Sequence, residues 1–296
     1  INTPEILIGV LEILYKYNGQ KHATQEFQDD LLELQNSLDT KIDLAKVDRG
    51  LNKNIIENSG QYWKALGLLG NSTGGNINLT DLGVSIAEGN SNYDNFIRNL
   101  YSNFSLPNVN IESNDTIQEW RDNGIEILPI KLIFNILFEI KRQSKSPSNW
   151  YLTPEKLKDI IIPLSVYSKL PIIKYVNEVF GYRSNPQSYE IWPNCTPGDN
   201  DFRMVKEYLL FLSNFGYLDL IELKDKSKRY YLNAKSIDAL EADYKTIEND
   251  NEPDSTEPIP FFIIADKNGN SSEGVSTSDS SGNSSGTETL CVLSSL

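Results

Sequence analysis

The residue types that carry most enzyme chemistry are scarce in this sequence. Its 296 residues include one histidine, His22, and two cysteines, Cys195 and Cys291, which stand far apart. This set is too small for the usual zinc site or Cys/His nucleophile, and a Ser/His/Asp triad would have to use His22. The sequence also lacks the GxxxxGK[ST] and GxGxxG patterns that cradle phosphates. We therefore do not expect these classes of catalytic site.

One acidic pattern comes near the signature of a two-metal nuclease. Asp254 precedes the apolar run 259–265, and Asp266 and Lys267 follow it. In such nucleases one residue separates the second acid from the lysine, so that both side chains leave the same face of a strand. Here the two residues are adjacent and would face opposite sides. We predict no catalytic residue, metal ligand or cofactor in this chain. A complete hydrolase would require Asp254, Asp266 and Lys267 to converge in space.

The remaining candidates are side chains that could contact DNA. Arg203 and Lys206 stand three residues apart, which places them on one face of a predicted helix. Basic side chains also crowd a predicted hairpin turn, where they would contact phosphates. For each residue, a solvent-facing or core role is the competing interpretation. The candidate DNA-binding residues are Asn58, Ser59, Gln61, Lys64, Arg203, Lys206, Lys226, Lys228 and Arg229.

The charge distribution bears directly on the choice of partner. The net charge of -14 disfavours nucleic acid at first sight, because phosphate binding relies on lysine and arginine. Residues 241–296, however, contain 11 acidic and 2 basic residues, whereas residues 1–240 contain 30 and 25. The excess acid therefore lies mainly in the tail, and a mildly acidic body with local basic clusters can still bind double-stranded DNA.

The elements that would position the candidate residues form a pattern that occurs twice. In the first half, helices are predicted at 4–17, at 24–38 and from residue 43 to about 66, followed by a turn and a short strand at 77–80. Thr80 then caps a further short helix. We interpret this order as a helical trio followed by a hairpin.

The second half repeats that order. An apolar helix is predicted at 125–140, and Thr153 caps the helix that follows. A helix at 201–215 then leads into strands at 217–223 and 229–232, joined by the lysine-rich turn. We predict a mainly α fold with small β-hairpins (α+β), built as two winged-helix-like DNA-recognition modules in tandem. The predicted divisions are a first module at 1–110, a linker at 111–123, a second module at 124–247, and an acidic, Ser/Gly-rich linker or tail at 248–296.

The compartment follows from what the sequence does not contain. No apolar run approaches the length of a membrane span, and the first residues lack the basic start of a signal peptide. With only two cysteines, the chain is expected in the cytoplasm without a membrane partner. Because the chain starts at Ile1 and ends in a Ser/Gly-rich tract, it is expected to be a fragment of a longer protein. Its oligomeric state is left open.

Several segments between residues 50 and 235 show a turn-strand-cap pattern or a helix-cap pattern: QYWKALGLL at 61–69, NLTDLGVSIAEG at 78–89, FSLPN at 104–108, NGIEILPIKLIFNIL at 123–137 and YLTPEKL at 151–157. They resemble a known family, the type IIS restriction endonucleases of the AlwI-like and BpuJI-like kind. These enzymes join tandem winged-helix recognition domains to a separate PD-(D/E)xK nuclease. The resemblance implies binding of double-stranded DNA at a defined sequence, with Mg-dependent cleavage by a domain outside this chain. Its motifs are structural, so no site residue is carried over.

Two other classes of protein fit the same pattern. A tandem winged-helix regulator of transcription or replication would be self-sufficient and often dimeric, whereas a restriction fragment would lack its nuclease domain. A winged-helix module for protein interaction is favoured by the acidic charge and disfavoured by the basic hairpin. The parent protein implied by the resemblance is a type II site-specific deoxyribonuclease, and the chain itself is expected to be non-catalytic.

Overall fold

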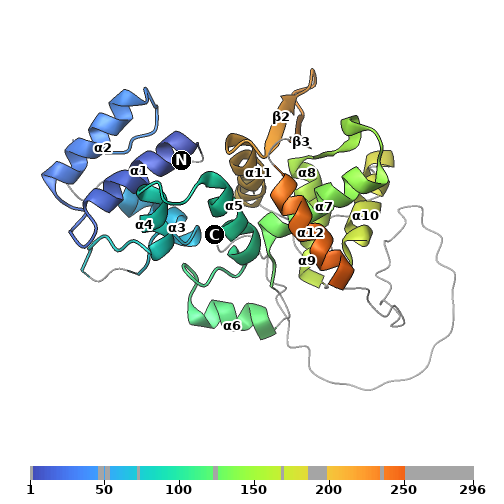
Figure 1. The fold of residues 1–296 in the computed structure, drawn as a ribbon, viewed down its shortest axis with the longest axis horizontal. Helices are drawn as coiled ribbons and strands as arrows, with labels where there is room; N and C mark the ends of the chain where they lie inside the picture. Colours follow the sequence, from blue (N-terminus) through green and yellow to red (C-terminus); the bar gives the residue numbers. More distant parts are fainter. Residues whose placement is uncertain are drawn as a thin grey trace, which may run out of the picture.

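The computed structural model describes residues 3–45, 50, 54–71, 74–122, 126–167, 170–185, 199–233 and 237–250. These parts of the chain are mainly helical and include one small antiparallel sheet (Figure 1). Within them, no helix combines the length and the apolar character that crossing a bilayer requires.

The N-terminal half consists of helices whose starts are set by capping residues. Asn54 Oδ1 accepts hydrogen bonds from the backbone N–H groups of Ile56 (3.0 Å) and Glu57 (3.3 Å), which fixes the start of the third helix. The Trp63 indole donates to the carbonyl of Leu7 at 3.3 Å and joins this helix to the first. The helices are α1 (Pro4–Lys16), α2 (Gln25–Ser37), α3 (Ile55–Ala65), α4 (Asp81–Ala87), α5 (Tyr93–Asn103) and α6 (Asn114–Asp122).

Three extended segments of this half pair with one another through isolated bridges. Lys21, after α1, pairs with Asn76, and Leu69, after α3, pairs with Leu79. All the pairings are antiparallel. The last of the three segments in the sequence, 76–79, therefore lies between the segment at Lys21 and the segment at Leu69. The strand predicted at 77–80 is present only as these bridges.

The C-terminal half places its three strands in the same order. The sheet runs β1-β3-β2, with Tyr151 opposite Tyr231 and Leu218 opposite Leu232, so the last strand again lies in the middle. The predicted hairpin is thereby confirmed. The elements are α7 (Pro129–Gln143), η2 (Pro147–Asn149), β1 (Tyr151–Leu152), α8 (Pro154–Lys156), the π-helical turn η3 (Leu157–Ile161), α9 (Ile162–Tyr167), α10 (Ile172–Ser184), α11 (Asp199–Asn214), β2 (Leu218–Glu222), β3 (Lys228–Leu232) and α12 (Asp238–Asp250).

Helix α5 joins the two halves. The fully buried ring of Phe96 packs against Phe211 and Phe215 of α11, with ring centroids 6.3 and 5.9 Å away. Arg98 forms an ion pair with Asp243 of α12 at 3.0 Å. Figure 1 shows α5 between the N-terminal helices and the C-terminal half. As a result, one continuous cluster of buried apolar residues runs from α1 to α12.

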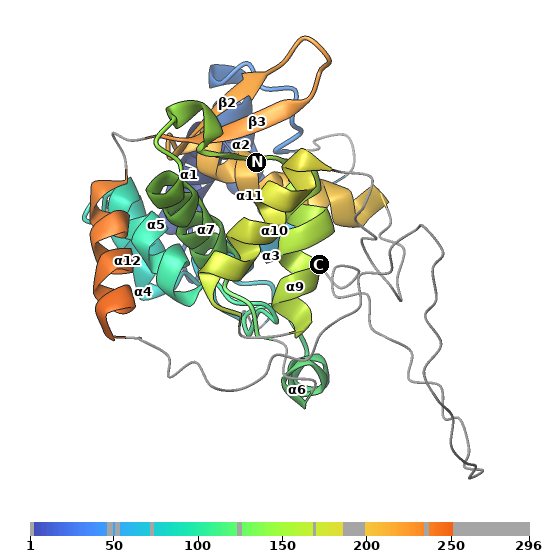
Figure 2. The ribbon, with the colours of Figure 1, turned by 90° about the vertical axis from the view of Figure 1, so that its right-hand side faces the viewer.

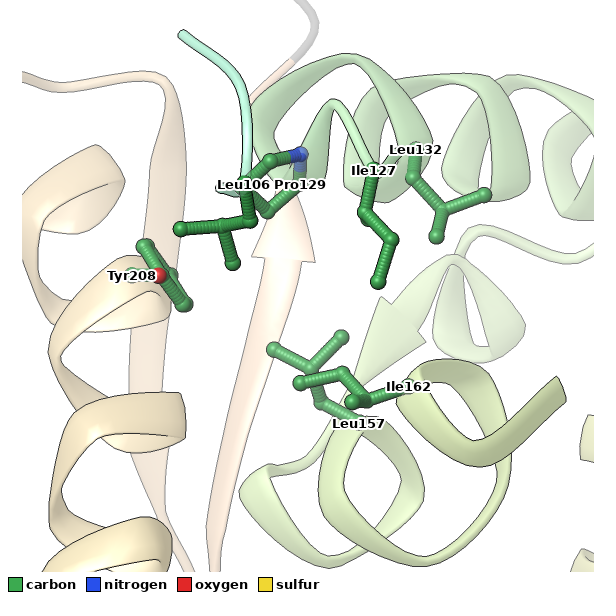
Figure 3. Close-up of a pocket in the computed structure, with 7 residues that line it drawn as sticks. All are labelled: Leu106, Ile127, Pro129, Leu132, Leu157, Ile162 and Tyr208. Carbon is green, nitrogen blue, oxygen red and sulfur yellow. The ribbon is translucent and has the colours of Figure 1, made fainter. Parts of the chain in front are cut away.

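A small pocket opens where the two halves meet around α7 (Figure 3). Its only polar lining group is the hydroxyl of Tyr208, which is buried without a partner, and burial raises the pKa of that hydroxyl. A pocket without an ionisable acid or base at neutral pH offers packing space and no catalytic chemistry. It is lined by Leu106, Ile127, Pro129, Leu132, Leu157, Ile162 and Tyr208.

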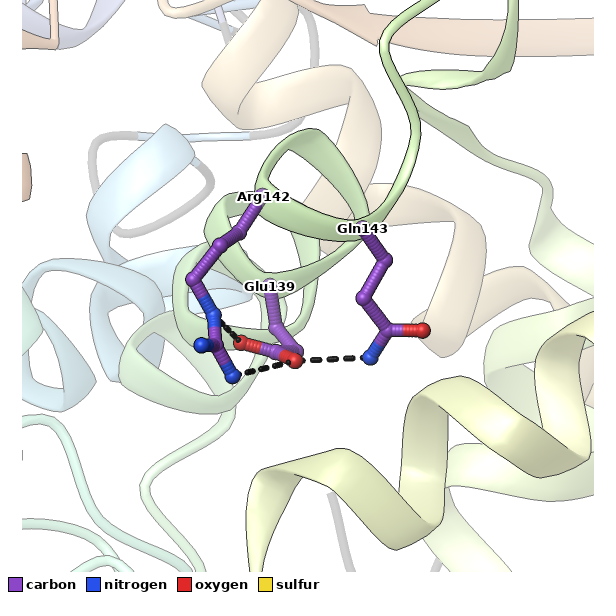
Figure 4. Close-up of polar contacts among 3 residues, drawn as sticks. All are labelled: Glu139, Arg142 and Gln143. Carbon is purple, nitrogen blue, oxygen red and sulfur yellow. Dashed lines mark hydrogen bonds and ion pairs between the residues drawn. The ribbon is translucent and has the colours of Figure 1, made fainter.

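The buried carboxylate of Glu139, near the end of α7, is neutralised locally (Figure 4). Arg142 donates from Nε and Nη2 at 2.6 and 2.9 Å, and Gln143 donates from Nε2 at 2.6 Å. Glu139 is 1% exposed. Because both oxygens accept strong hydrogen bonds at i+3 and i+4 spacing, the charge is tolerated in the core. We assign this group to the structure of the helix end.

The stretch predicted as a linker, 111–123, contains helix α6, which the sequence analysis did not predict. Ser113 Oγ accepts a hydrogen bond from the backbone N–H of Thr116 at 3.1 Å and caps the helix. Ile117 and Trp120, three residues apart, are both buried. A capped nine-residue helix with two apolar anchors therefore forms despite the polar composition. The division of the chain into two modules stays a prediction.

Two further sequence predictions are adjusted by the structure. The helix predicted at 125–140 begins only at Pro129, because Ile127 is extended and pairs with Leu106. Residues 248–250 of the predicted tail continue α12. The nuclease-like residues Asp254, Asp266 and Lys267 lie outside the described residues.

Candidate nucleic-acid interface

The turn between β2 and β3 presents lysines on a fixed backbone. Its ends are joined by a hydrogen bond from Leu223 N to Ser227 O at 2.9 Å. The Asp225 carboxylate accepts from Ser227 N (3.0 Å) and Ser227 Oγ (2.6 Å), and these bonds hold its pKa below the ordinary value. Lys226 adopts a left-handed conformation with φ of 66°. The hairpin projects beyond the helices (Figures 1 and 2).

The basic residues of the hairpin have different surroundings. Lys226 and its neighbour Lys224 are exposed at the turn. Lys228 lies opposite Glu222, with its Nζ 3.7 Å from the carboxylate. Arg229 instead turns to the ring of Tyr151, 4.5 Å from its centroid. Of the three hairpin residues predicted to bind DNA, Lys226 is therefore best placed to meet a phosphate at the tip.

Helix α11 carries the second predicted basic pair. Lys206 is half-buried, and the helical spacing puts Arg203 one turn earlier on the same face. The side chain of Arg203 lies outside the described residues. Leu209 and Leu212 are fully buried on the other side of α11, as predicted. The pair thus belongs to a helix anchored in the core.

Helix α3 carries the remaining predicted residues. Gln61 is exposed and Lys64 is half-buried. Asn58 and Ser59 lie within α3, but their side chains fall outside the described residues. Trp63 is fully buried, so the core interpretation is right for this residue.

The two helices predicted to read DNA lie close together. Burial raises the pKa of the Tyr62 hydroxyl on α3, and the Glu207 carboxylate of α11 raises it further. Glu207 also acts on the buried hydroxyl of Tyr230, whose pKa is raised first by burial. Glu207 thus marks the place where α3, α11 and β3 converge.

A cationic group missed by the sequence predictions surrounds the ring of Tyr151 on β1. The distances to the ring centroid are 4.2 Å for Arg183 Cζ, 4.5 Å for Arg229 Cζ and 4.6 Å for Lys156 Nζ. The ring of Tyr231 packs 5.2 Å from that of Tyr151. We call these five residues the Tyr151 cluster. Only Arg229 was predicted, because residues from β1, α8, α10 and β3 share no local spacing in the sequence.

The described residues offer no alternative site of metal-dependent chemistry. Among them, no three His, Cys, Asp or Glu side chains are arranged to hold a metal ion. The basic hairpin, α11, α3 and the Tyr151 cluster are consequently the features that could carry a function of binding.

Comparison with known proteins reveals a fold likeness. No protein-family model matches the sequence, and no curated protein does. The structure resembles a chain described as "Crystal structure of pyrene- and phenanthrene-modified DNA in complex with the BpuJ1 endonuclease binding domain". The TM-score is 0.53 and the identity is 16%, over 80% of this chain and 78% of that chain. The protein therefore shares the fold of an endonuclease binding domain, in agreement with the resemblance predicted from its sequence.

Proposed function

We propose that this protein recognises double-stranded DNA at a defined sequence, as the specificity part of a type II restriction endonuclease. The observation that carries the proposal is the likeness, over 80% of the chain, to a structure in which the BpuJ1 endonuclease binding domain is in complex with DNA. Cleavage is assigned to a separate Mg-dependent nuclease domain, and the protein would act in the cytoplasm.

The order of elements supports two winged-helix-like modules. In a winged helix, a helix, a strand and further helices precede the recognition helix, and a two-stranded wing follows it. Elements α7 to β3 have this order. The position of β3 between β1 and β2 in the sheet is also consistent with a winged helix. The bridges of the N-terminal half repeat that strand order. In this proposal α3 and α11 are the reading helices.

The candidate residues divide between two roles. Gln61, Lys64, Arg203 and Lys206, on the two helices, are proposed to contact base edges or phosphates, together with Asn58 and Ser59. The hairpin residues Lys226, Lys228 and Arg229 are proposed to contact phosphates only, because a projecting turn follows the DNA backbone. Affinity should then depend strongly on salt.

The role of the hairpin is tested by titrating the protein into labelled duplex DNA at several salt concentrations. We expect the variant Lys224→Gln/Lys226→Gln to bind more weakly and to lower the slope of log affinity against log salt by about 1–2, because each lost phosphate contact removes about 0.9. The control Lys41→Gln/Lys174→Gln removes the same charge from exposed positions elsewhere. Equal slopes for the two variants would rule out the hairpin as a phosphate contact.

A further inference from the structure

The cations of the Tyr151 cluster are held close to one another. Lys156, Arg183 and Arg229 all lie within 4.6 Å of one ring centroid, so no two of them are separated by more than twice that distance. The ring face attracts each cation, but this attraction is small compared with the repulsion between like charges in a partly buried place. The arrangement is therefore electrostatically unbalanced.

Nearby carboxylates do not restore the balance. Among the residues that the structure describes, none places a carboxylate oxygen within 4 Å of these three cations. Glu155, next to Lys156 on α8, and Asp225, in the hairpin turn, act only as weak, more distant charges. Among the described residues, the cluster therefore has a net positive charge with no paired counter-ion.

Backbone groups hold Arg183 in this position. Its Nη1 donates to the carbonyl of Asn149 at 3.1 Å, and its Nη2 donates to the carbonyl of Tyr151. The Nε atom is buried without a partner. Two of the five guanidinium N–H donors thus fix the side chain, and the buried Nε–H has no hydrogen-bond partner among the described residues.

Lys156 is the most deeply buried cation of the cluster. The residue is 6% exposed, and no acceptor among the described residues binds its Nζ. Burial, followed by the charges of Arg183 and Arg229, lowers its pKa to about 7, and Glu155 opposes this shift only weakly. Helix α11 also packs on α8, and its Glu207 carboxylate acts on Tyr230 of the adjacent strand.

The side chains of the cluster differ in burial. Arg229, Arg183 and Tyr231 are only half-buried, whereas Tyr151 and Lys156 are buried. An anion that binds to the cluster would find the two arginines more accessible than the lysine. Arginine and lysine together bind phosphate with charge-assisted hydrogen bonds.

We propose that the Tyr151 cluster is a pocket for one phosphate group, with Lys156, Arg183 and Arg229 as its ligands and the two tyrosine rings as its wall. The inference rests on the proposed function in one respect: it takes the phosphate to be a phosphodiester of the DNA backbone. Because the pocket lies at the base of the hairpin, the phosphate it binds is distinct from one met by Lys226 at the tip.

Filling the pocket has a consequence for protons. An anion beside Lys156 favours its charged form. At a pH above the pKa of Lys156 in the free protein, this lysine therefore takes up a proton when phosphate binds. At pH 8 the pocket should take up about one proton per bound duplex. Lysines exposed at the hairpin tip are already charged at that pH and contribute none.

The first arm of the test measures duplex binding by calorimetry at pH 8 in two buffers of different ionisation enthalpy. We expect the wild type to take up about one proton per duplex and Lys156→Met to take up none. We also expect Arg229→Gln to bind about tenfold more weakly, as befits the loss of one charge-assisted contact. Lys174→Gln, an exposed control, should retain both the affinity and the uptake. The phosphate-pocket proposal would be overturned if the wild type bound the duplex without proton uptake, or if Lys156→Met took up as many protons as the wild type. Either result would leave the proposed function intact.

The second arm uses dimethyl phosphate, which carries one charge and does not titrate near pH 8. Lysine labelled with ¹³C at Cε reports its own protonation. We expect one lysine resonance to move to its protonated position on addition of dimethyl phosphate, and the response to be lost in Lys156→Met. If the protein binds no duplex but shows this response, the proposed function fails and the pocket stands with free phosphate as its source. Absence of the response in a protein that also binds no duplex would refute both.

Discussion

At the scale of single residues, local spacing predicted the cations that are close in sequence and missed those that converge from separate elements. Lys226 stands in a run of basic residues at a turn, and its exposure follows from that position. Lys156 and Arg183 meet only because β1, α8 and α10 fold against one another, and no spacing in the sequence encodes that contact. Tyr62 shows the same limit, since the effect of the Glu207 charge on its hydroxyl depends on how the halves pack.

The buried Lys156 predicts a particular dependence of stability on pH. Its folded-state pKa, about 7, lies below the unfolded value of about 10.4, so the unfolded state binds more protons between these values. Stability should therefore rise with pH across this window by an amount of the order of a few kcal/mol, and the penalty is fully present below pH 7.

Replacing the lysine isolates this effect. The free energy of unfolding of Lys156→Met, minus that of the wild type, should have its largest positive value near pH 6. This difference should decline steadily towards pH 10. Chemical denaturation at each pH measures the difference, and Lys174→Met, at an exposed position, should give a flat line. A flat line for Lys156→Met as well would mean that this lysine titrates normally.

At the scale of elements, most of the helices were predictable because their caps are written in the sequence. Thr80 Oγ1, for example, accepts from Gly83 N at 3.0 Å at the start of α4. The start of α3 was predicted wrongly, because the helix predicted from residue 43 begins only at Ile55, after the cap Asn54. The short strands were less predictable, because two or three paired residues give no alternating pattern. Helix α6 was missed because its apolar face consists of Ile117 and Trp120 within a polar stretch.

The packing of α4 leaves no space for a side chain at Gly83. A Cβ atom there would lie 2.2 Å from the carbonyl oxygen of Leu68, a backbone atom that cannot turn aside. We expect Gly83→Ala to lower the free energy of unfolding by about 1–3 kcal/mol or more, as overpacking does. Gly60→Ala, inside α3, would meet only a side-chain methyl of Ile56 at 3.4 Å, so the change should be neutral or stabilising by up to about 1 kcal/mol. Thermal denaturation compares the two, and similar stabilities would show that α4 does not approach Leu68 so closely.

At the scale of the whole molecule, α5 makes the halves interdependent. The sequence predicts α5 as part of the first module, yet its Phe96 packs into α11 and its Arg98 pairs with α12. This contact fixes α11 and α12 relative to α5 and so joins the two halves. Hydrophobic periodicity shows which face of a helix is buried. It does not show which other element that face packs against, so this long-range contact could not be predicted.

The continuous core predicts coupled unfolding. Phe96→Ala should destabilise the protein by about 3–5 kcal/mol, because it leaves a cavity between α5 and α11. Hydrogen exchange should then accelerate in both α1 and α10, on either side of the junction. Tyr93→Ala removes a half-exposed ring from the same helix and should have a smaller effect. Faster exchange in only one of the two helices would show that the halves unfold independently.

The central claim, recognition of duplex DNA at a defined sequence, is tested most directly by selection from a randomised duplex pool. The protein is incubated with the pool, the retained fraction is sequenced, and the selection is repeated at higher salt and in the presence of Mg²⁺. We predict enrichment of one short asymmetric site that persists at higher salt, without cleavage. A palindromic site would favour a dimeric regulator instead. Failure to retain any duplex at low salt would contradict the account.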